Sequence, residues 1–224
     1  NISIKILKKC NLMAIYIERT LAKFMNLSEK LATEFNHFLK TITYENNGEL
    51  DPSLSEEERQ KSISLMRVNA SGEVSAQALY RGQAFFTKTP DVRKHLIKAG
   101  DEEFDHLVWC SKRLDELGGK KSVLDPFYYA GSFTLGSVAA LIGDGTSLGF
   151  VEETEKQVVE HLKRHLQEMS PKDEKSREIL EKMLEEEEIH GQEAKDHGSK
   201  ELPLPVKGMM TATSKIMTTL SRYF

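Results

Sequence analysis

The sequence predicts an all-α protein, a bundle of four long helices with an apolar connection between the second and the third. Three observations support this fold class. Apolar residues recur at helical spacing over several long stretches, glycine and proline mark the ends of these stretches, and no stretch of useful length alternates as a strand would. With 224 residues, 39% of them hydrophobic and 29% charged, the chain can bury one sizeable core.

The expected organisation is an N-terminal extension and linker (1–54) followed by one main domain (55–224). The extension opens on a basic stretch without acidic residues up to Glu18, and it lacks the apolar core and cleavage site of a secretory signal. It is consistent with a transit-like leader or with sequence upstream of Met13. Two isolated cysteines, Cys10 and Cys110, lack C-x-x-C spacing and fit a reducing compartment.

The charge of the chain argues against a nucleic-acid partner. Its 35 acidic and 31 basic residues give a net charge of −4, and both signs are spread along the sequence. No basic stripe is therefore present that could neutralise a phosphate backbone.

Turn residues and capping signals delimit the bundle helices. Ser55 and Glu58 are spaced like a capping box, Pro90 and Pro171 suit the first turn of a helix, and Gly118 follows a long helical pattern. We therefore expect helices at residues 55–88, 90–118, 146–169 and 171–198.

Each expected helix carries ionisable side chains on its apolar stripe, where an unpaired charge costs several kcal/mol or more. Something in the core must therefore neutralise them. These side chains are Glu73 on the first helix, Glu103 and His106 on the second, Glu155 on the third, and Glu187 and His190 on the fourth.

The arrangement occurs twice along the chain. A lone core-facing glutamate precedes a Glu-x-x-His pair by one helix in each half, as Glu73 precedes Glu103 and Glu155 precedes Glu187. One E-x-x-H pair is weak evidence, but two with this spacing match the ligand set of ferritin-like di-iron or di-manganese bundles. Four carboxylates balance two divalent ions, and oxygen and imidazole ligands without thiolate suit iron or manganese.

Helical periodicity also chooses between neighbouring glutamates. In "VEETE" (151–155) the stripe selects Glu155, with Glu152 as the fallback, and in "EEEEIH" (185–190) it selects Glu187. Solvated positions are then expected at Glu185 and Glu188, with Glu186 at the edge of that surface.

The alternative without metal is a bundle in which buried histidines and glutamates form hydrogen-bonded pairs. It would have to satisfy six ionisable groups in one small volume. Among the other histidines, His161 is a candidate for supporting the site without binding metal, and His165 falls beside the stripe and is expected to be solvated. Surface placement is expected for His37, His95 and His197.

Two apolar segments complete the expected fold. Residues 124–143 connect the second and third bundle helices, as the long crossover of a ferritin-like bundle does, and the tail 206–224 is expected to form an extra C-terminal helix. Proline, glycine and Asp125 dilute the first segment below the apolar character of a membrane-spanning helix. The two segments could lie on a membrane or simply cover the bundle.

Five stretches of the chain resemble the demethoxyubiquinone hydroxylase family of ubiquinone biosynthesis. The resemblance spans about residues 55–224 and includes the spacing between the motifs. The stretches are "LMRVNASGEVSAQALYRGQA" (65–84), "DEEFDHLVWCSKRLDELG" (101–118), "PFYYAGSFTLGSVAALIGD" (126–144), "SLGFVEETEKQVVEHLKRHL" (147–166) and "EKSREILEKMLEEEEIHGQEA" (174–194).

The resemblance implies a monooxygenase that uses two iron ions and dioxygen to hydroxylate the ring of a polyprenyl benzoquinol lacking one methoxy group. It implies no catalytic residue beyond the metal ligands, among which Glu103 and Glu187 are expected to bridge the two irons. The implied ligand set is Glu73, Glu103, His106, Glu155, Glu187 and His190, the same six positions that the stripes select.

The resemblance also bears on partners and location. It implies a hydrophobic quinol, an unidentified reductant, other ubiquinone-biosynthesis proteins, and peripheral contact with a membrane through 124–143 and 206–224. The expected location is the cytoplasmic face of a bacterial inner membrane or, alternatively, the matrix side of the mitochondrial inner membrane. A non-catalytic scaffold, a ferroxidase and a peroxide-reducing protein are the rival functions.

The chain departs from the family pattern at one position. Family members usually have histidine three residues before the first ligand glutamate, and this chain has Ala70 there. Ala70 cannot supply the hydrogen bond or the proton transfer of an imidazole. The departure leaves the six expected ligands in place and keeps the scaffold alternative open.

Overall fold

The computed structural model describes residues 23, 25–44 and 52–224, and the chain divides into two compact units, Asn1–Lys40 and Thr41–Phe224. In the first unit, residues 25–40 are helical. The basic stretch 1–22, Cys10 and part of the expected linker lie outside the described residues. The second unit carries the expected bundle.

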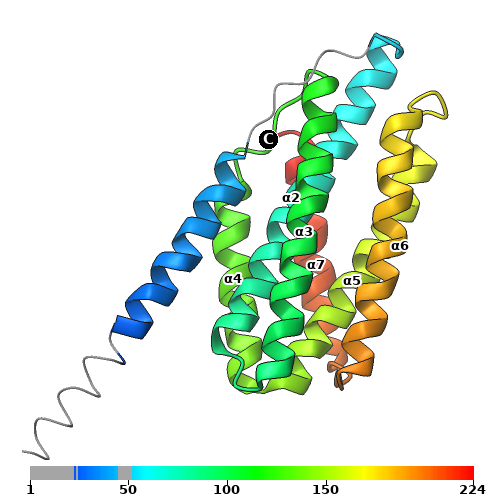
Figure 1. Ribbon diagram of the computed structural model, residues 1–224. Coiled ribbons are helices and arrows are strands. Elements are labelled where there is room, and N and C mark those ends of the chain that lie inside the picture. Colours follow the sequence, from blue (N-terminus) through cyan, green and yellow to red (C-terminus); the bar gives the residue numbers. More distant parts are fainter. Residues whose placement is uncertain (1–22, 24, 45–51) are drawn as a thin grey trace, which may run out of the picture. The chain divides into compact units, whose positions relative to one another are not determined.

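Helices account for most of the second unit, and no strand occurs among its described residues. The four predicted bundle helices are present as α2, α3, α5 and α6, and α4 connects α3 to α5 (Figure 1). The extra C-terminal helix expected for the tail is present as α7. The bounds are α2 (Glu56–Phe86), α3 (Pro90–Glu116), α4 (Asp125–Ile142), α5 (Asp144–Glu168), α6 (Glu174–Asp196) and α7 (Leu204–Ser221).

The capping predictions are confirmed at one helix and need correction at another. Ser55 and Glu58 form the predicted capping box at the start of α2. Helix α6 begins at Glu174, so Pro171 lies in the turn before the helix instead of in its first turn. Asp173 caps α6 in its place, because its side chain accepts a hydrogen bond from the backbone N–H of Ser176.

Glycines allow α2 and α4 to approach closely. A Cβ atom at Gly82 would lie 2.1 Å from the carbonyl oxygen of Phe133, and one at Gly136 would lie 2.2 Å from that of Leu79. No residue with a side chain fits at that separation. The crossover helix is therefore held against α2 by backbone contact.

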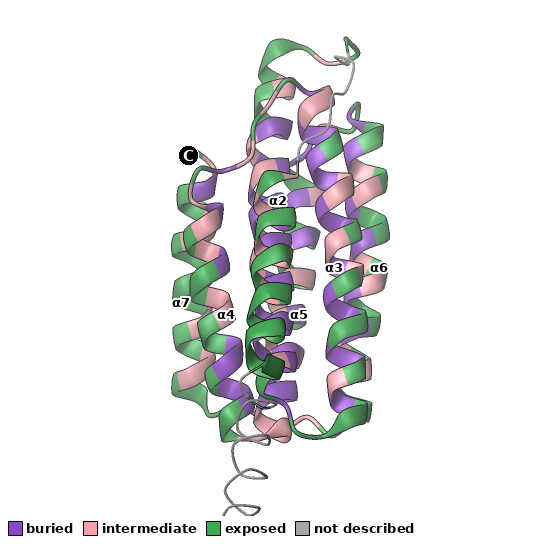
Figure 2. Cartoon of the chain, turned by 60° about the vertical axis from the view of Figure 1, so that its left-hand side comes forward, coloured by how far each residue is buried: buried purple, intermediate pink, exposed green. Residues whose placement is uncertain are grey.

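The predicted stripes face the interior of the bundle (Figure 2). The ionisable side chains on the stripes are buried with the apolar ones, and the half-buried exceptions are Val158 and Leu166 of α5 and Leu184 of α6. This burial brings carboxylates and imidazoles of α2, α3, α5 and α6 into one core.

Two histidines expected at the surface are buried. His165 is 1% exposed, because its Nδ1 shares a hydrogen bond of 2.9 Å with Oδ1 of Asn69 on α2. His95 is covered by the ring of His197, whose centroid lies 4.2 Å away, and its Nδ1 lies 3.6 Å from a carboxylate oxygen of Glu193. The sequence did not indicate these partners, since each lies on another helix or beyond the end of one.

Helices α4 and α7 lie side by side and leave large apolar side chains exposed. The hydroxyl of Tyr128 on α4 donates to the carbonyl of Met217 on α7 at 3.4 Å, and the backbone of Val123 bonds to that of Phe224. Within the described residues, no helix is both long and apolar enough to cross a bilayer. The exposed apolar residues include Phe127, Leu135, Leu141, Ile142, Met209 and Ile216.

Candidate metal centre

Three helices bring four candidate ligands together at the centre of the bundle. Glu73 comes from α2, Glu103 and His106 come from α3, and Glu187 comes from α6. Their ligand atoms all lie within 4.8 Å of one another, and all four side chains are buried. Such a group needs positive charge in its middle.

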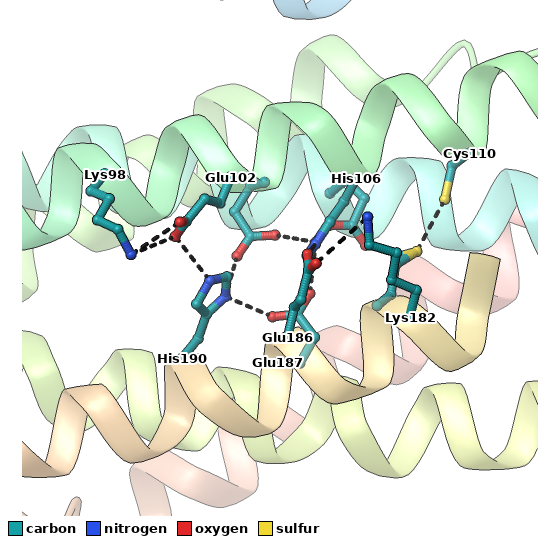
Figure 3. A network of polar contacts seen from close by, with 11 residues as sticks. Lys98, Glu102, His106, Cys110, Lys182, Glu186, Glu187 and His190 are labelled. Atoms are coloured by element: carbon teal, nitrogen blue, oxygen red, sulfur yellow. Dashed lines mark hydrogen bonds and ion pairs between the residues drawn. The ribbon is translucent and has the colours of Figure 1, made fainter. Parts of the chain in front are cut away.

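Glu103 and Glu187 each face both histidines of the Glu-x-x-His pairs. Figure 3 shows Glu187 between His106 and His190. Nδ1 of His106 lies 3.4 Å from Oε2 of Glu103 and 3.1 Å from Oε1 of Glu187. Nδ1 of His190 lies 3.3 Å from the other oxygen of Glu103 and 3.1 Å from the other oxygen of Glu187. Each of these two carboxylates therefore presents one oxygen to each histidine.

Glu155 of α5 is buried near this group but lies outside the set of four. Its Oε1 accepts a hydrogen bond of 2.6 Å from the hydroxyl of Tyr80, and its Oε2 has no hydrogen-bond partner among the described residues. Tyr80 belongs to the apolar stripe of α2, and helical periodicity does not predict that its hydroxyl reaches a carboxylate on α5. Tyr80 thus fixes Glu155 and leaves one oxygen available.

Burial and mutual repulsion set the protonation of the carboxyl groups. Burial raises the pKa of Glu73 and of Glu155 well above the usual range, and the charges of Glu103 and Glu187 raise both further. Burial also opposes ionisation of Glu103, but the nearby imidazoles of His106 and His190 outweigh it and hold the pKa of Glu103 below its usual value.

The histidines respond in the opposite direction. Burial acts to lower the pKa of each imidazole, but the surrounding carboxylates outweigh it, so the pKa of His106 is raised and that of His190 rises to about 11. The site therefore attracts positive charge, either as protons on the imidazoles or as cations between the carboxylates.

The donor atoms fit a metal ion. Buried atoms with no hydrogen-bond partner among the described residues include Oε2 of Glu73, both carboxylate oxygens of Glu103 and Nδ1 of His106. Buried polar atoms normally have a partner, so these atoms of the buried group are open to a ligand. Carboxylate oxygen and imidazole nitrogen are the ligands that iron and manganese bundles use, and iron is favoured by the ferritin-like arrangement of helices.

The family is decided by a match between residues 60–221 and the family model described as "Ubiquinone biosynthesis protein COQ7". The chain belongs to the COQ7 family. This confirms the resemblance that the motifs indicated, and it places the buried Glu and His group within the matched residues of a COQ7-family protein.

Two relatives illustrate how similar the COQ7-family members are to this chain. A protein of Francisella tularensis subsp. novicida (strain U112) is 51% identical over 175 residues, which are 78% of this chain and 83% of the relative. A protein of Francisella philomiragia subsp. philomiragia is 49% identical over 175 residues, again 78% of this chain and 83% of the relative. Both are named 3-demethoxyubiquinol 3-hydroxylase.

A solved structure supports the ferritin-like fold. The bacterioferritin-related protein of Bacteroides fragilis, described as a dodecameric thioferritin, matches 74% of this chain and 92% of its own with a TM-score of 0.52. At 20% sequence identity the likeness concerns the fold alone. It agrees with the predicted all-α, ferritin-like class.

All six predicted ligands are buried in the core of this COQ7-family bundle, although not in a single group. The set of four contains neither His190 nor Glu155: His190 contacts its edge through Glu103 and Glu187, and Glu155 stands apart with Tyr80. The assignment of metal ligands stays a prediction. Ala70, where the family usually has histidine, is completely buried in α2.

An apolar cavity reaches the centre from the side of α4 and α7. Its volume is about 360 Å³, and Glu73 belongs both to its wall and to the buried group. Other lining residues are His161 on α5 and Met209, Met210 and Met217 on α7. The centre is therefore accessible to an apolar molecule.

Proposed function

We propose that this chain is a 3-demethoxyubiquinol hydroxylase that acts with two iron ions and dioxygen. One observation carries the proposal: Glu73 lies in the buried carboxylate and imidazole group and also lines the apolar cavity. A candidate metal centre and a space for an apolar ring thus share a wall. Membership of the COQ7 family and the names of the relatives support the reaction.

The contacts of Glu103 and Glu187 support two metal positions. Each carboxylate offers one oxygen toward His106 and the other toward His190, as bridging ligands would. Glu73, whose Oε2 lies 3.5 Å from Nδ1 of His106, would complete one position. Glu155, whose charge interacts with His190, would complete the other.

A pair of iron ions bound there would pass two electrons from a reductant to dioxygen, so that, with two protons, one oxygen atom enters the quinol ring and the other leaves as water. The chain itself positions the ligands and keeps water away. The Tyr80 hydroxyl holds Glu155, and the buried side chains of α2, α3, α5 and α6 enclose the site. Excluding water protects a reactive oxidant from side reactions.

The cavity wall suits a substrate with an isoprenoid tail. Methionines of α7, with flexible and polarizable side chains, adapt to an apolar ligand better than branched residues do. His161 belongs to the same wall, and burial lowers its pKa to about 4, so its imidazole is neutral at physiological pH. A neutral imidazole can hydrogen-bond a quinol hydroxyl without adding charge to the cavity.

The exposed apolar side chains of α4 and α7 would place the cavity against a lipid surface. These helices carry the two segments, 124–143 and 206–224, that were expected to contact a membrane, and both contribute residues to the cavity wall. A helix lying in the membrane interface buries its apolar face in the headgroup region. A quinol could then pass from lipid to the centre without crossing water.

Quinone profiling in a bacterial strain that lacks its own 3-demethoxyubiquinol hydroxylase tests this function. Expression of the chain is expected to restore ubiquinone and remove the demethoxy precursor, whereas Glu103→Ala is expected to leave the precursor in place because a central metal ligand is lost. The control Glu185→Ala, an exposed glutamate of α6, is expected to behave as the unaltered chain does.

Two outcomes would overturn the proposal. If the chain is produced, binds iron and leaves the precursor unchanged, an iron-handling function such as that of a ferroxidase replaces hydroxylation. If Glu103→Ala changes neither the iron content nor the quinone profile, the non-catalytic scaffold is the better account.

A further inference from the structure

Both candidate histidine ligands hydrogen-bond through their second ring nitrogen to a glutamate of the opposite helix. Nε2 of His106 on α3 lies 2.7 Å from Oε2 of Glu186 on α6, and Nε2 of His190 on α6 lies 3.2 Å from Oε2 of Glu102 on α3 (Figure 3). The contacts thus cross between the helices in both directions. These contacts use Nε2 of each ring, whereas Nδ1 of each ring faces Glu103 and Glu187.

The two glutamates occupy equivalent positions in the internal repeat. Each directly precedes a glutamate of the buried group, and each follows a lysine by four residues, so that both halves read Lys-x-x-x-Glu-Glu-x-x-His. Nζ of Lys98 lies 3.0 Å from Oε1 of Glu102, and Nζ of Lys182 lies 3.8 Å from Oε1 of Glu186. The same chain of lysine, glutamate and histidine therefore occurs twice.

The chemistry of these groups fixes which nitrogen carries hydrogen. An ionised carboxylate only accepts hydrogen bonds, so Nε2 of each histidine must donate. The Nδ1 atoms, which face Glu103 and Glu187, are then the atoms available to a cation. A carboxylate on the far nitrogen also raises the basicity of a metal-bound imidazole and fixes the plane of its ring.

We propose that Glu102 and Glu186 are positioning residues that hold the ligand histidines of the opposite helix, His190 and His106, with Nδ1 toward the metal centre. Lys98 and Lys182 form ion pairs with these two carboxylates. The proposal rests on the metal centre of the proposed function, and it assigns a role to residues outside the six ligands.

The two glutamates are partly exposed and the histidines are buried, which favours a positioning role for the glutamates over a role in core packing. Glu102 and Glu186 are 37% and 36% exposed, whereas the histidines that they contact are 5% and 0% exposed. Both glutamates line a polar cavity of about 370 Å³ formed by residues of α3 and α6, on a wall different from that of the apolar cavity. Their carboxylates thus combine a partly exposed position with a hydrogen bond to a buried imidazole.

Cobalt(II) titration of the purified full chain tests the proposal, because binding and the visible absorption of cobalt both report on the histidines without any turnover. The variants are Glu102→Ala, Glu186→Ala and the corresponding glutamine variants. Asp105→Asn removes one charge from the same polar cavity, and Glu185→Ala removes one from the same helix as Glu186. Far-ultraviolet circular dichroism checks that each variant is folded.

Each alanine variant is expected to weaken cobalt binding by about 10- to 100-fold, as loss of a carboxylate partner of a ligand histidine typically does. The glutamine variants keep an acceptor without its charge and are expected to lose less affinity while still shifting the absorption bands. The two control variants are expected to match the unaltered chain. A role in packing alone would leave the spectrum of the isosteric glutamine variants unchanged.

The crossing of the contacts gives a second, sharper test. In a His190→Ala background, Glu102→Ala is expected to cost no further affinity for the remaining ion, whereas in a His106→Ala background it is expected to cost its full effect. Glu186→Ala is expected to show the reverse pattern.

The outcomes for the two proposals are distinguishable. If the unaltered chain takes up no cobalt or iron, the metal centre of the proposed function fails. If it binds metal and the alanine variants keep its affinity and spectrum, or if the crossed backgrounds give additive effects, the positioning role of Glu102 and Glu186 is overturned and the metal centre stands.

Discussion

The four consecutive glutamates at 185–188 show how one helical position decides the role of a carboxylate. Glu187 is 1% exposed and faces both candidate histidine ligands, while Glu185 and Glu188 are exposed, as the periodicity of α6 predicted. Glu186 lies at the edge, also as predicted, but its contact with His106 was not foreseen. Periodicity identifies the face of a residue but not its partner on another helix.

Two further residues show the same limit. Tyr80 lies on the apolar stripe of α2, which indicates only a packing role, and the position of His165 beside the stripe predicts exposure to solvent. The hydroxyl of Tyr80 instead bonds Glu155, and the imidazole of His165 is buried against Asn69. A buried polar group requires a partner, but the sequence does not name it when the partner lies on another helix.

The pH dependence of stability can be tested at Asp125. This residue is 3% exposed, accepts a hydrogen bond from Ser71 at 2.6 Å, and burial raises its pKa from 3.8 to about 6. A raised pKa in an acid means that the folded state prefers the proton, so stability is lost as pH rises from about 4 through 6. Asp125→Asn keeps an acceptor and removes the charge, and its stability relative to the unaltered chain is expected to improve by about 1 to 3 kcal/mol between pH 4 and pH 8.

Urea unfolding at both pH values measures this difference, with Asp105→Asn, an exposed position, as the control that should show no such change. An equal stability difference at pH 4 and pH 8 would contradict the assignment of the buried charge to Asp125.

At the scale of the helices, the predictions were most successful where several signals agreed. The start of α2 combines a capping box with a long apolar stripe, and its prediction at residue 55 is within one residue of the observed start at Glu56. The start of α6 rested on Pro171 alone and was placed three residues early, because the side chain of Asp173 caps the helix there. The crossover was identified as a connection, but its close contact with α2 depends on tertiary packing that spacing does not reveal.

The contact between α2 and α4 makes opposite predictions for two glycines of one helix. Gly136→Ala is expected to destabilise the fold by about 1 to 3 kcal/mol or more, because its Cβ would lie 2.2 Å from a carbonyl oxygen of α2 and force the helices apart. Gly131→Ala on the exposed side of α4, where a Cβ meets nothing within 4 Å, is expected to stabilise by about 0.5 to 1 kcal/mol.

Thermal and urea unfolding of both variants decide this point. If Gly136→Ala is as stable as the unaltered chain, α2 and α4 do not pack through their backbones as described.

At the scale of the whole second unit, two of the cavities of the bundle differ in their lining. The apolar cavity involves α4 and α7, and the polar cavity involves α3 and α6. The sequence predicted the apolar segments but not the cavities, because cavities depend on how side chains of several helices meet. The apolar cavity borders the candidate centre at Glu73, and the polar cavity borders it at His190.

Membrane contact through α4 and α7 can be tested with vesicles of phosphatidylethanolamine and phosphatidylglycerol. Phe127 and Ile216 are 74% and 62% exposed, and the double variant Phe127→Glu with Ile216→Glu is expected to lower vesicle binding roughly tenfold or more, since burying such a side chain is worth about 1.5 to 3 kcal/mol. Ile189→Glu changes an exposed isoleucine of α6 and serves as the control. Binding is measured as the fraction of protein that sediments with the vesicles. If the double variant and the Ile189→Glu control lose binding equally, a specific membrane-binding surface on α4 and α7 is excluded.

The fate of dioxygen tests the central claim most directly. The purified full chain, loaded with iron and supplied with a reductant, is incubated with a short-chain demethoxyubiquinol under ¹⁸O₂. The mass of the product is then measured by mass spectrometry. The account predicts a ring-hydroxylated product that carries one ¹⁸O atom, and no product from Glu103→Ala. Iron-loaded protein that forms no product, or a product whose new oxygen comes from water, would contradict it.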